Sequence, residues 1–235
     1  PRGIAAKLRR VHWPVIVTVC LLAGIGITML YSVSGGSFVP WAERHALRFL
    51  IMLAIVVIMA TVRLEVWVKL AYPAYAMALL MLALVPFIGV EALGARRWIG
   101  MGGLTFQPSE LMKLALVAAL ARYYMLMPKR DLRRVHYVAI PLAMIGVPVI
   151  LTLQQPDLGS AALFIALGLS LMFLAGVPLR YFALGAVLTL ASLPAIWAGM
   201  HGYQKRRIEI FLNPGMDPFG AGYHIMQSKI ALGAG

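Results

Sequence analysis

The sequence predicts an all-α fold, a polytopic bundle of membrane-spanning helices. Of its 235 residues, 62% are hydrophobic and only 12% are charged, and apolar stretches of about 20 residues recur along the chain. Charged residues make up about 25% of ordinary soluble domains, so this composition excludes that class. The formal net charge of +13 does not favour nucleic-acid binding, because cytoplasmic loops of membrane proteins accumulate Lys and Arg.

Seven stretches are apolar and long enough to be spans. They cover residues 14–31, 46–62, 67–90, 109–127, 137–154, 158–176 and 180–201. Only "LQQPDLGS" separates the fifth from the sixth, so these two are expected to form a tight helical hairpin. Prolines inside the stretches are tolerated where neighbouring helices satisfy the backbone groups that proline leaves unpaired; they are Pro73, Pro86, Pro141, Pro148 and Pro194.

Basic residues near the span ends predict the orientation. They lie in the N-terminal tail and after the second, fourth and sixth stretches, for example Arg9, Arg63, Arg134 and Arg180. All of these lie on one side if the N-terminus is cytoplasmic, and residues 202–235 then form an outer-face loop. The prolines and glycines of that segment predict irregular structure, and its stretch "YHIMQSKIAL" is compatible with a short amphipathic helix on the membrane.

Basic residues also fall on the predicted outer side, where Lys and Arg are disfavoured. They are Arg96 and Arg97 in "GARRWIG", Lys205, Arg206 and Arg207 in "YQKRRIEIF", and Lys229. Guanidinium groups bind phosphate bidentately, so these residues suggest an anionic ligand. The alternative is contact with anionic lipid headgroups at span ends. The glycines near Arg97, which permit tight turns close to a ligand, are Gly94, Gly100, Gly102 and Gly103.

The fourth stretch begins with "QPSELMKL". Pro108 suits the first helical position, Gln107 precedes it and Glu110 falls in the first turn, which is a helix-start signal. Glu110 and Lys113 are three residues apart and share one helix face. They form either a buried ion pair aided by the helix dipole, or the polar wall of a cavity that holds Arg97 and a substrate.

The sixth stretch begins in the same way, with Pro156 opening the helix and Asp157 in its first turn. Asp157 is either a simple helix-capping carboxylate or part of a ligand site. Under the predicted topology, Asp157 and Glu110 lie at the outer face, at a depth similar to that of the two basic clusters. One site could therefore contain both carboxylates and both clusters.

Three ordered motifs resemble one protein family. "GARRWIGMGGLTFQPSELMKL", "QPDLGSA" and "DPFGAGYHIMQSKIALGAG" resemble the SEDS family (shape, elongation, division and sporulation), most closely its RodA elongation branch and next its FtsW division branch. The resemblance implies a ten-span protein of the bacterial cytoplasmic membrane, acting at the outer face. Residues 1–235 are then expected to form a single SEDS-type transmembrane domain with seven spans, truncated at the C-terminus.

The resemblance also implies a function. Members of the family are peptidoglycan glycosyltransferases that polymerise lipid II during elongation and rod-shape maintenance, releasing undecaprenyl pyrophosphate with inversion. The implied partners are a class B penicillin-binding protein transpeptidase and other elongation-complex membrane proteins, with no nucleic acid. The pyrophosphate would be the anion, and Arg97 is preferred to Arg96 because it directly precedes Trp98. Glu110 and Lys113 match the family's charged pair, and Asp157 matches its Gln-Pro-Asp motif.

The candidate substrate-binding residues are Arg97, Arg96, Glu110, Lys113, Gln107, Asp157, Lys205, Arg206, Arg207 and Lys229. No catalytic residue is assigned, because the family's general base is an aspartate expected beyond Gly235. No cofactor is required by any motif, although a divalent cation at the pyrophosphate is an alternative. Two other functions stay open: a lipid II flippase, which needs charge across the whole membrane depth, and a non-catalytic scaffold of the elongation complex.

Overall fold

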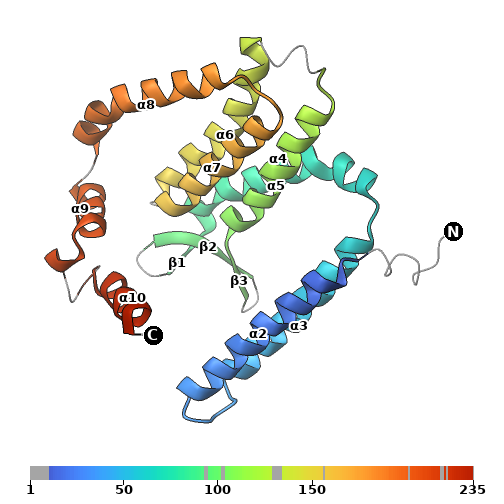
Figure 1. Ribbon diagram of the computed structural model, residues 1–235, viewed down its shortest axis with the longest axis vertical. Helices are drawn as coiled ribbons and strands as arrows, with labels where there is room; N and C mark the ends of the chain where they lie inside the picture. The colour runs from blue at the N-terminus through green and yellow to red at the C-terminus, as the bar shows by residue number, and fades with distance from the viewer. Residues whose placement is uncertain are drawn as a thin grey trace. The chain divides into compact units, whose positions relative to one another are not determined.

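The computed structural model describes residues 11–92, 95–101, 104–128, 134–155, 157–200, 202–217, 220 and 222–234. Its helices are α2 (Trp13–Val33), α3 (Trp41–Thr61), α4 (Leu64–Ile88), α5 (Pro108–Met125), α6 (Val135–Gln154), α7 (Leu158–Leu174), α8 (Leu179–Gly199), α9 (Gly202–Leu212) and α10 (Tyr223–Ala234), with a 3-10 helix, η2 (Pro214–Met216). Between α4 and α5 lie strands β1 (Val90–Ala92), β2 (Ala95–Met101) and β3 (Leu104–Phe106), as Figure 1 shows.

A helix lies at each of the seven predicted stretches, which confirms the all-α membrane class. Among the described residues, four helical segments are both long and apolar enough to cross a membrane, namely α2, α3, α4 and the segment Tyr137–Gln154 of α6. The apolar stretches Leu158–Leu174 and Leu179–Ala195 are shorter, and α5 contains Glu110, Lys113 and Arg122. The count of seven spans therefore stays a prediction.

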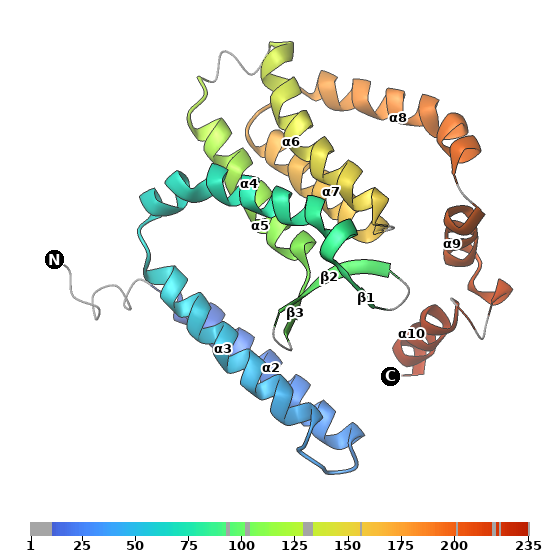
Figure 2. The same cartoon turned by 180° about the vertical axis from the view of Figure 1, so that it is seen from behind.

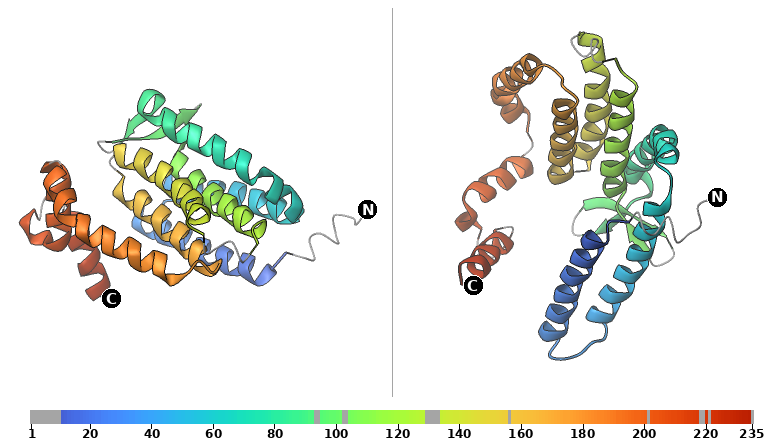
Figure 3. Two further views of the ribbon diagram at one scale, coloured as in Figure 1. Left: turned by 90° about the horizontal axis from the view of Figure 1, so that it is seen from above. Right: turned by 45° about the vertical axis from the view of Figure 1, so that its right-hand side comes forward.

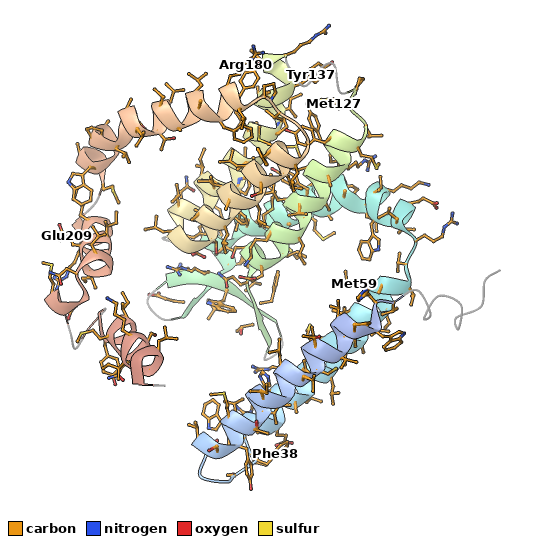
Figure 4. The ribbon with its side chains drawn as sticks, in the orientation of Figure 1. Phe38, Met59, Met127, Tyr137, Arg180 and Glu209 are labelled. Atoms are coloured by element: carbon orange, nitrogen blue, oxygen red, sulfur yellow. The ribbon has the colours of Figure 1, made fainter. Side chains whose placement is uncertain are left out.

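The chain divides into two compact units, residues 1–128 with 136–171 and residues 129–135 with 172–235. In the first unit, α2 and α3 form an antiparallel hairpin, seen from the side in Figure 3. Its turn passes through Gly35 (φ 66°) and Gly36 (φ 84°), a left-handed conformation that glycine adopts without steric cost. Figure 4 shows Phe38 at this turn and Met59 near the other end of α3.

The side chains of this hairpin are mostly exposed in the isolated chain. No residue of α2 is buried, and Leu21, Leu22 and Met29 are each more than 60% exposed. A helix that exposes apolar side chains on all sides suits a hydrocarbon surrounding, where its own backbone hydrogen bonds satisfy its polar groups.

Helices α4, α5, α6 and α7 lie side by side, as Figures 1 and 2 show from opposite directions. Helices α6 and α7 approach closely at Gly168, since a Cβ atom there would overlap the Ile145 side chain. The predicted hairpin of the fifth and sixth stretches is therefore confirmed.

Prolines organise the packing of this bundle. A proline inside a helix has no N–H, so the carbonyl four residues earlier loses its helical donor. Helix α4 contains Pro73 and Pro86, and α6 contains Pro141 and Pro148. The carbonyls that these four prolines leave unpaired are therefore expected at positions 69, 82, 137 and 144.

Each of these carbonyls accepts a hydrogen bond from a side chain outside its own helix. The bonds run from Arg122 Nη1 to Lys69 O (2.9 Å), from Gln155 Nε2 to Leu82 O (2.8 Å), from Tyr123 Oη to Tyr137 O (3.2 Å) and from Tyr75 Oη to Met144 O (2.8 Å). The expectation that neighbouring elements satisfy these backbone groups is confirmed for these four prolines.

The small sheet between α4 and α5 was not predicted from the sequence. The strands are antiparallel in the order β1-β2-β3, with Glu91 opposite Arg96 and Gly100 opposite Thr105. Strand β2 packs against α4 and α5. Glycine-containing breaks at positions 93–94 and 102–103 separate three short runs in the sequence, which is a hairpin signal that could have revealed the strands.

In the second unit, segment 202–235 is more helical than predicted. Helix α10 covers the stretch "YHIMQSKIAL" and confirms the short helix expected there. Helix α9, whose charged sequence is "GYQKRRIEIFL", was not predicted, because residues 202–235 were expected to form an outer-face loop. The turn of η2 follows α9 directly.

Candidate functional site

Strand β2 places its two adjacent arginines in different surroundings. Successive side chains of a strand point to opposite faces. The Arg96 side chain is 59% exposed, and its Nε lies 3.9 Å from Glu91 Oε2 on the neighbouring strand. The Arg97 side chain is only 24% exposed. Of the two, Arg97 is therefore the one held inside the fold.

The turn between α6 and α7 holds the Arg97 guanidinium. Arg97 Nε donates a hydrogen bond to the carbonyl oxygen of Gln155 at 3.1 Å. Arg97 Nη1 lies 4.0 Å from Asp157 Oδ1. Two groups of one turn thus fix the position of a cation on a strand about 60 residues earlier in the chain.

Asp157 is the N-cap of α7, one position before the helix starts at Leu158. Its Oδ1 accepts from the backbone N–H of Ser160 (3.1 Å), and its Oδ2 accepts from Ser160 Oγ (2.7 Å) and Gln107 Nε2 (3.2 Å). The prediction of a first-turn position is wrong by one residue, because the carboxylate must precede the helix to reach the N–H of its third residue. Pro156 lies outside the described residues.

These contacts define what Asp157 can do. The residue is 8% exposed, and both of its oxygens already accept hydrogen bonds. A buried carboxylate also repels an anion. Asp157 therefore supports Arg97 rather than offering itself to an anionic ligand.

The start of α5 completes the cluster. The helix begins at Pro108 with Gln107 as its N-cap residue, as predicted. Ser109 is 1% exposed, and its Oγ lies 3.5 Å from Ser160 Oγ. Gln107 and Ser109 thus join the beginnings of α5 and α7 next to Asp157.

Glu110 and Lys113 form the predicted pair on one face of α5. Lys113 Nζ lies 2.7 Å from Glu110 Oε2, and the side chains are 21% and 60% exposed respectively. The carboxylate is therefore not buried, so the interpretation as a fully buried ion pair is wrong. The ammonium group of Lys113, which is the less exposed of the two charged groups, is paired with the Glu110 carboxylate.

Three residues of the cluster were missed by the sequence analysis, namely Gln155, Ser160 and Ser109. All three are buried, with exposures of 5%, 7% and 1%. Gln155 and Ser160 belong to the same "LQQPDLGS" turn as Asp157, so the motif itself was the available signal.

The remaining candidates belong to the second unit. Lys205 Nζ lies 5.8 Å from the centroid of the Trp197 ring, and Arg206 Nη2 lies 3.8 Å from Asp217 Oδ2. Lys229 is exposed on α10. That these residues share a site with Arg97 stays a prediction. The side chain of Arg207 and residues Gly94, Gly102 and Gly103 lie outside the described residues.

The described residues offer no cluster of side chains suited to a metal ion. Within the described ranges, no group of three or more His, Cys, Asp or Glu side chains is placed so that it could hold a metal ion. No residue is therefore assigned to the divalent cation considered as an alternative.

Comparisons with known proteins place the chain in a family. The family model described as "Cell cycle protein", which covers FtsW, RodA and SpoVE, matches residues 12–235. The chain is 35% identical over 231 residues to peptidoglycan glycosyltransferase MrdB of Escherichia coli K12, with 96% of this chain and 61% of MrdB covered. It is 34% identical over 219 residues to the probable peptidoglycan glycosyltransferase FtsW of Tolumonas auensis, with 91% of this chain and 57% of that protein covered.

Solved structures of the same kind of protein also match the chain. A chain of a peptidoglycan synthase complex that coordinates polymerization and crosslinking matches with a TM-score of 0.80 and 33% identity, covering 93% of this chain and 64% of its own length. The crystal structure of the rod shape determining protein RodA of Thermus thermophilus matches with a TM-score of 0.66 and 32% identity, covering 82% and 61%. The resemblance predicted from the three motifs is confirmed.

The chain thus spans about three fifths of the length of the curated relatives it matches. Its apolar helices and these relatives make it a multi-pass membrane protein of bacteria. On the match over residues 12–235, the chain belongs to the FtsW, RodA and SpoVE family of cell cycle proteins, which is the SEDS family.

Proposed function

We propose that this chain is part of a peptidoglycan glycosyltransferase that polymerises lipid II into glycan strands during cell elongation, and that Arg97 binds the pyrophosphate of that lipid. The observation that carries the proposal is the Arg97 guanidinium, held by the Gln155 carbonyl and Asp157. Similarity to a peptidoglycan glycosyltransferase over 96% of the chain supports the reaction class.

The chemistry explains why a fixed cation is useful. The sugar 4-hydroxyl of the acceptor attacks the anomeric carbon of the donor with inversion, the carbon–oxygen bond to the pyrophosphate breaks, and undecaprenyl pyrophosphate leaves with the bonding electrons. Negative charge therefore grows on the leaving group. A guanidinium that is positioned beforehand stabilises this charge without reorganising during the reaction. The hydroxyl proton must pass to a general base, which no described residue is assigned to be.

Location and partners follow from the same proposal. The N-terminus is cytoplasmic, and β2 faces the outer side of the cytoplasmic membrane, where lipid II presents its disaccharide. A class B penicillin-binding protein is the proposed transpeptidase partner. The similarity to a chain from a synthase complex that combines polymerization with crosslinking supports this pairing.

A flippase is the second candidate, and Arg122 bears on it. A flippase needs charged groups along the whole path, and Arg122 is the cation in the last turn of α5, at the proposed cytoplasmic end. Its guanidinium lies 4.5 Å from the centroid of the Tyr72 ring, and its Nη1 donates to the carbonyls of Val68 (2.8 Å) and Lys69. This arrangement joins α5 to α4 and favours a packing role, which supports the polymerase.

The test compares substitutions of the two neighbouring arginines in the complete protein with its partner. In detergent with labelled lipid II, Arg97→Ala is expected to lower the rate of glycan formation by about 10²–10³-fold, the usual cost of losing one charge-stabilising donor. Arg97→Lys is expected to recover little, because an ammonium cannot make the same directed bonds to a carbonyl and a phosphate. Arg96→Ala is the matched control and should polymerise normally.

The opposite pattern would support the other functions. A scaffold predicts that Arg97→Ala and Lys113→Ala both leave polymerisation and partner binding intact. A flippase predicts that lipid II crosses proteoliposome membranes without formation of long glycan chains.

A further inference from the structure

Gln155 occupies a special place between α6 and α7. It is 5% exposed, and the turn around it is tight, because the backbone N–H groups of Gln155 and Asp157 both donate to the Thr152 carbonyl, at 3.0 and 3.2 Å. The Gln155 carbonyl thereby becomes available to the strand that faces this turn, where it accepts from Arg97 Nε.

The side chain of Gln155 is anchored on a different element. Its Nε2 donates to the Leu82 carbonyl of α4 at 2.8 Å. That carbonyl lacks a helical donor because the residue four positions later is Pro86. Gln155 therefore fills a hydrogen-bonding position that exists only because of this proline.

Gln155 thus connects α4 and β2, because its side chain and its main chain form one hydrogen bond to each. The side-chain amide fixes the turn to α4, and the main-chain carbonyl fixes Arg97. We propose that Gln155 is a positioning residue, which uses the carbonyl left unpaired by Pro86 to hold Arg97 in the orientation that binds the substrate pyrophosphate. The catalytic part of this inference rests on the proposed function, whereas the geometric part does not.

The alternative is that Gln155 only satisfies a buried carbonyl. Tyr75 does the same for the carbonyl that Pro148 leaves unpaired, and Tyr75 belongs to α4 rather than to the turn that holds Arg97. Tyr75→Phe is therefore the matched control, since it removes one donor from a proline-unpaired carbonyl without changing the α6–α7 turn.

The experiment distinguishes two roles of Gln155, hydrogen bonding to the Leu82 carbonyl and positioning of Arg97. Gln155→Met keeps the length of the side chain but removes its donor. Pro86→Ala restores an N–H that can pair with Leu82 O within the helix. In the variant Pro86→Ala/Gln155→Met, the buried carbonyl is satisfied while the turn has lost its anchor. Pro73→Ala controls for the straightening of α4.

Three quantities are measured on the complete protein in detergent: Tm, the kcat/KM for lipid II polymerisation, and backbone amide exchange in β2 by mass spectrometry. Gln155→Met and Tyr75→Phe should both lower Tm by several degrees, because each leaves a carbonyl unpaired, a buried one in the first case and a partly buried one in the second. Only Gln155→Met should lower kcat/KM, by about 10²-fold, the effect of a misplacement near 1 Å.

The combined variant decides the question. We expect Pro86→Ala/Gln155→Met to regain the Tm of Pro86→Ala and to keep the low kcat/KM and a faster exchange in β2. On an Arg97→Ala background, Gln155→Met should cause no further loss. Recovery of kcat/KM together with Tm would overturn the positioning role.

Amide exchange distinguishes failure of the proposed function from failure of the positioning role of Gln155. If the unsubstituted protein formed no glycan from lipid II, the proposed function would fail. Exchange in β2 would then decide the geometric claim alone. Faster exchange in Pro86→Ala/Gln155→Met than in Pro86→Ala supports it, and equal exchange contradicts it.

Discussion

At the scale of single residues, the exposure of an arginine side chain depends on which face of a strand it occupies. Arg96 and Arg97 are chemically identical neighbours, yet one is 59% exposed and the other 24% exposed. The difference follows from the alternation of side chains along β2, together with the turn that lies against one face. Asp157 shows the same dependence on its surroundings, since Ser160 and Gln107 hold its carboxylate by hydrogen bonds and Arg97 lies within ion-pair distance of it.

Substitution of Asp157 tests this supporting role. In Asp157→Asn, an NH2 group replaces the oxygen that accepts from Gln107 Nε2, so two donors oppose each other there, and the charge that faces Arg97 is lost. The free energy of unfolding should fall by about 1–3 kcal/mol, measured by thermal or denaturant unfolding in detergent. Ser109→Ala is the control and should cost less, because it removes only the 3.5 Å contact to Ser160. Unchanged stability of Asp157→Asn would contradict the assignment.

At the scale of elements, the bundle is assembled around interruptions of its helices. The prolines of α4 and α6 create unpaired carbonyls, and the glycine at position 168 allows α6 and α7 to approach closely. These residues weaken isolated helices in water, but here they provide the specific points at which helices meet. Small residues serve the same purpose in membrane bundles generally.

Gly168 provides a test of this packing. Gly168→Ala should lower the free energy of unfolding by about 1–3 kcal/mol, because the added methyl group overlaps the buried Ile145 side chain. Gly168→Ala combined with Ile145→Ala should regain part of the loss, whereas Gly146→Ala, where a Cβ would meet nothing within 4 Å, should change little. If all three variants unfolded at the same temperature, the close approach would be wrong.

At the scale of the whole molecule, the predicted orientation in the membrane decides which face carries the Arg97 cluster. The distribution of Lys and Arg predicts a cytoplasmic N-terminus, and the proposed function requires β2 on the outer side. Arg96 and Arg180 are both exposed, and the predicted topology puts Arg96 on the outer side of the membrane and Arg180 on the cytoplasmic side.

Cysteine labelling tests this orientation. In a cysteine-free form of the complete protein, with Cys20 replaced by alanine, Arg96→Cys should react with a membrane-impermeant maleimide in intact spheroplasts. Arg180→Cys should react only after permeabilisation. The reverse pattern would invert the topology and would place Arg97 on the cytoplasmic side.

The sequence by itself determined the membrane class, the seven helical stretches, the family, and the prominence of Arg97 and Asp157. These depend on composition, local periodicity and short motifs, which a single chain displays directly. The glycine-containing breaks at positions 93–94 and 102–103 are also visible in the sequence and are compatible with short strands, but no strand was predicted from them.

Only the tertiary structure decided which groups meet. It separated Arg97 from Arg96, moved Asp157 to the N-cap of α7, and revealed Gln155 between α4 and β2. The physical reason is that a hydrogen bond depends on the positions of two groups, and Leu82 and Gln155 lie 73 residues apart in the chain. The sequence marks the carbonyl that Pro86 leaves unpaired, but not the donor that the fold brings to it.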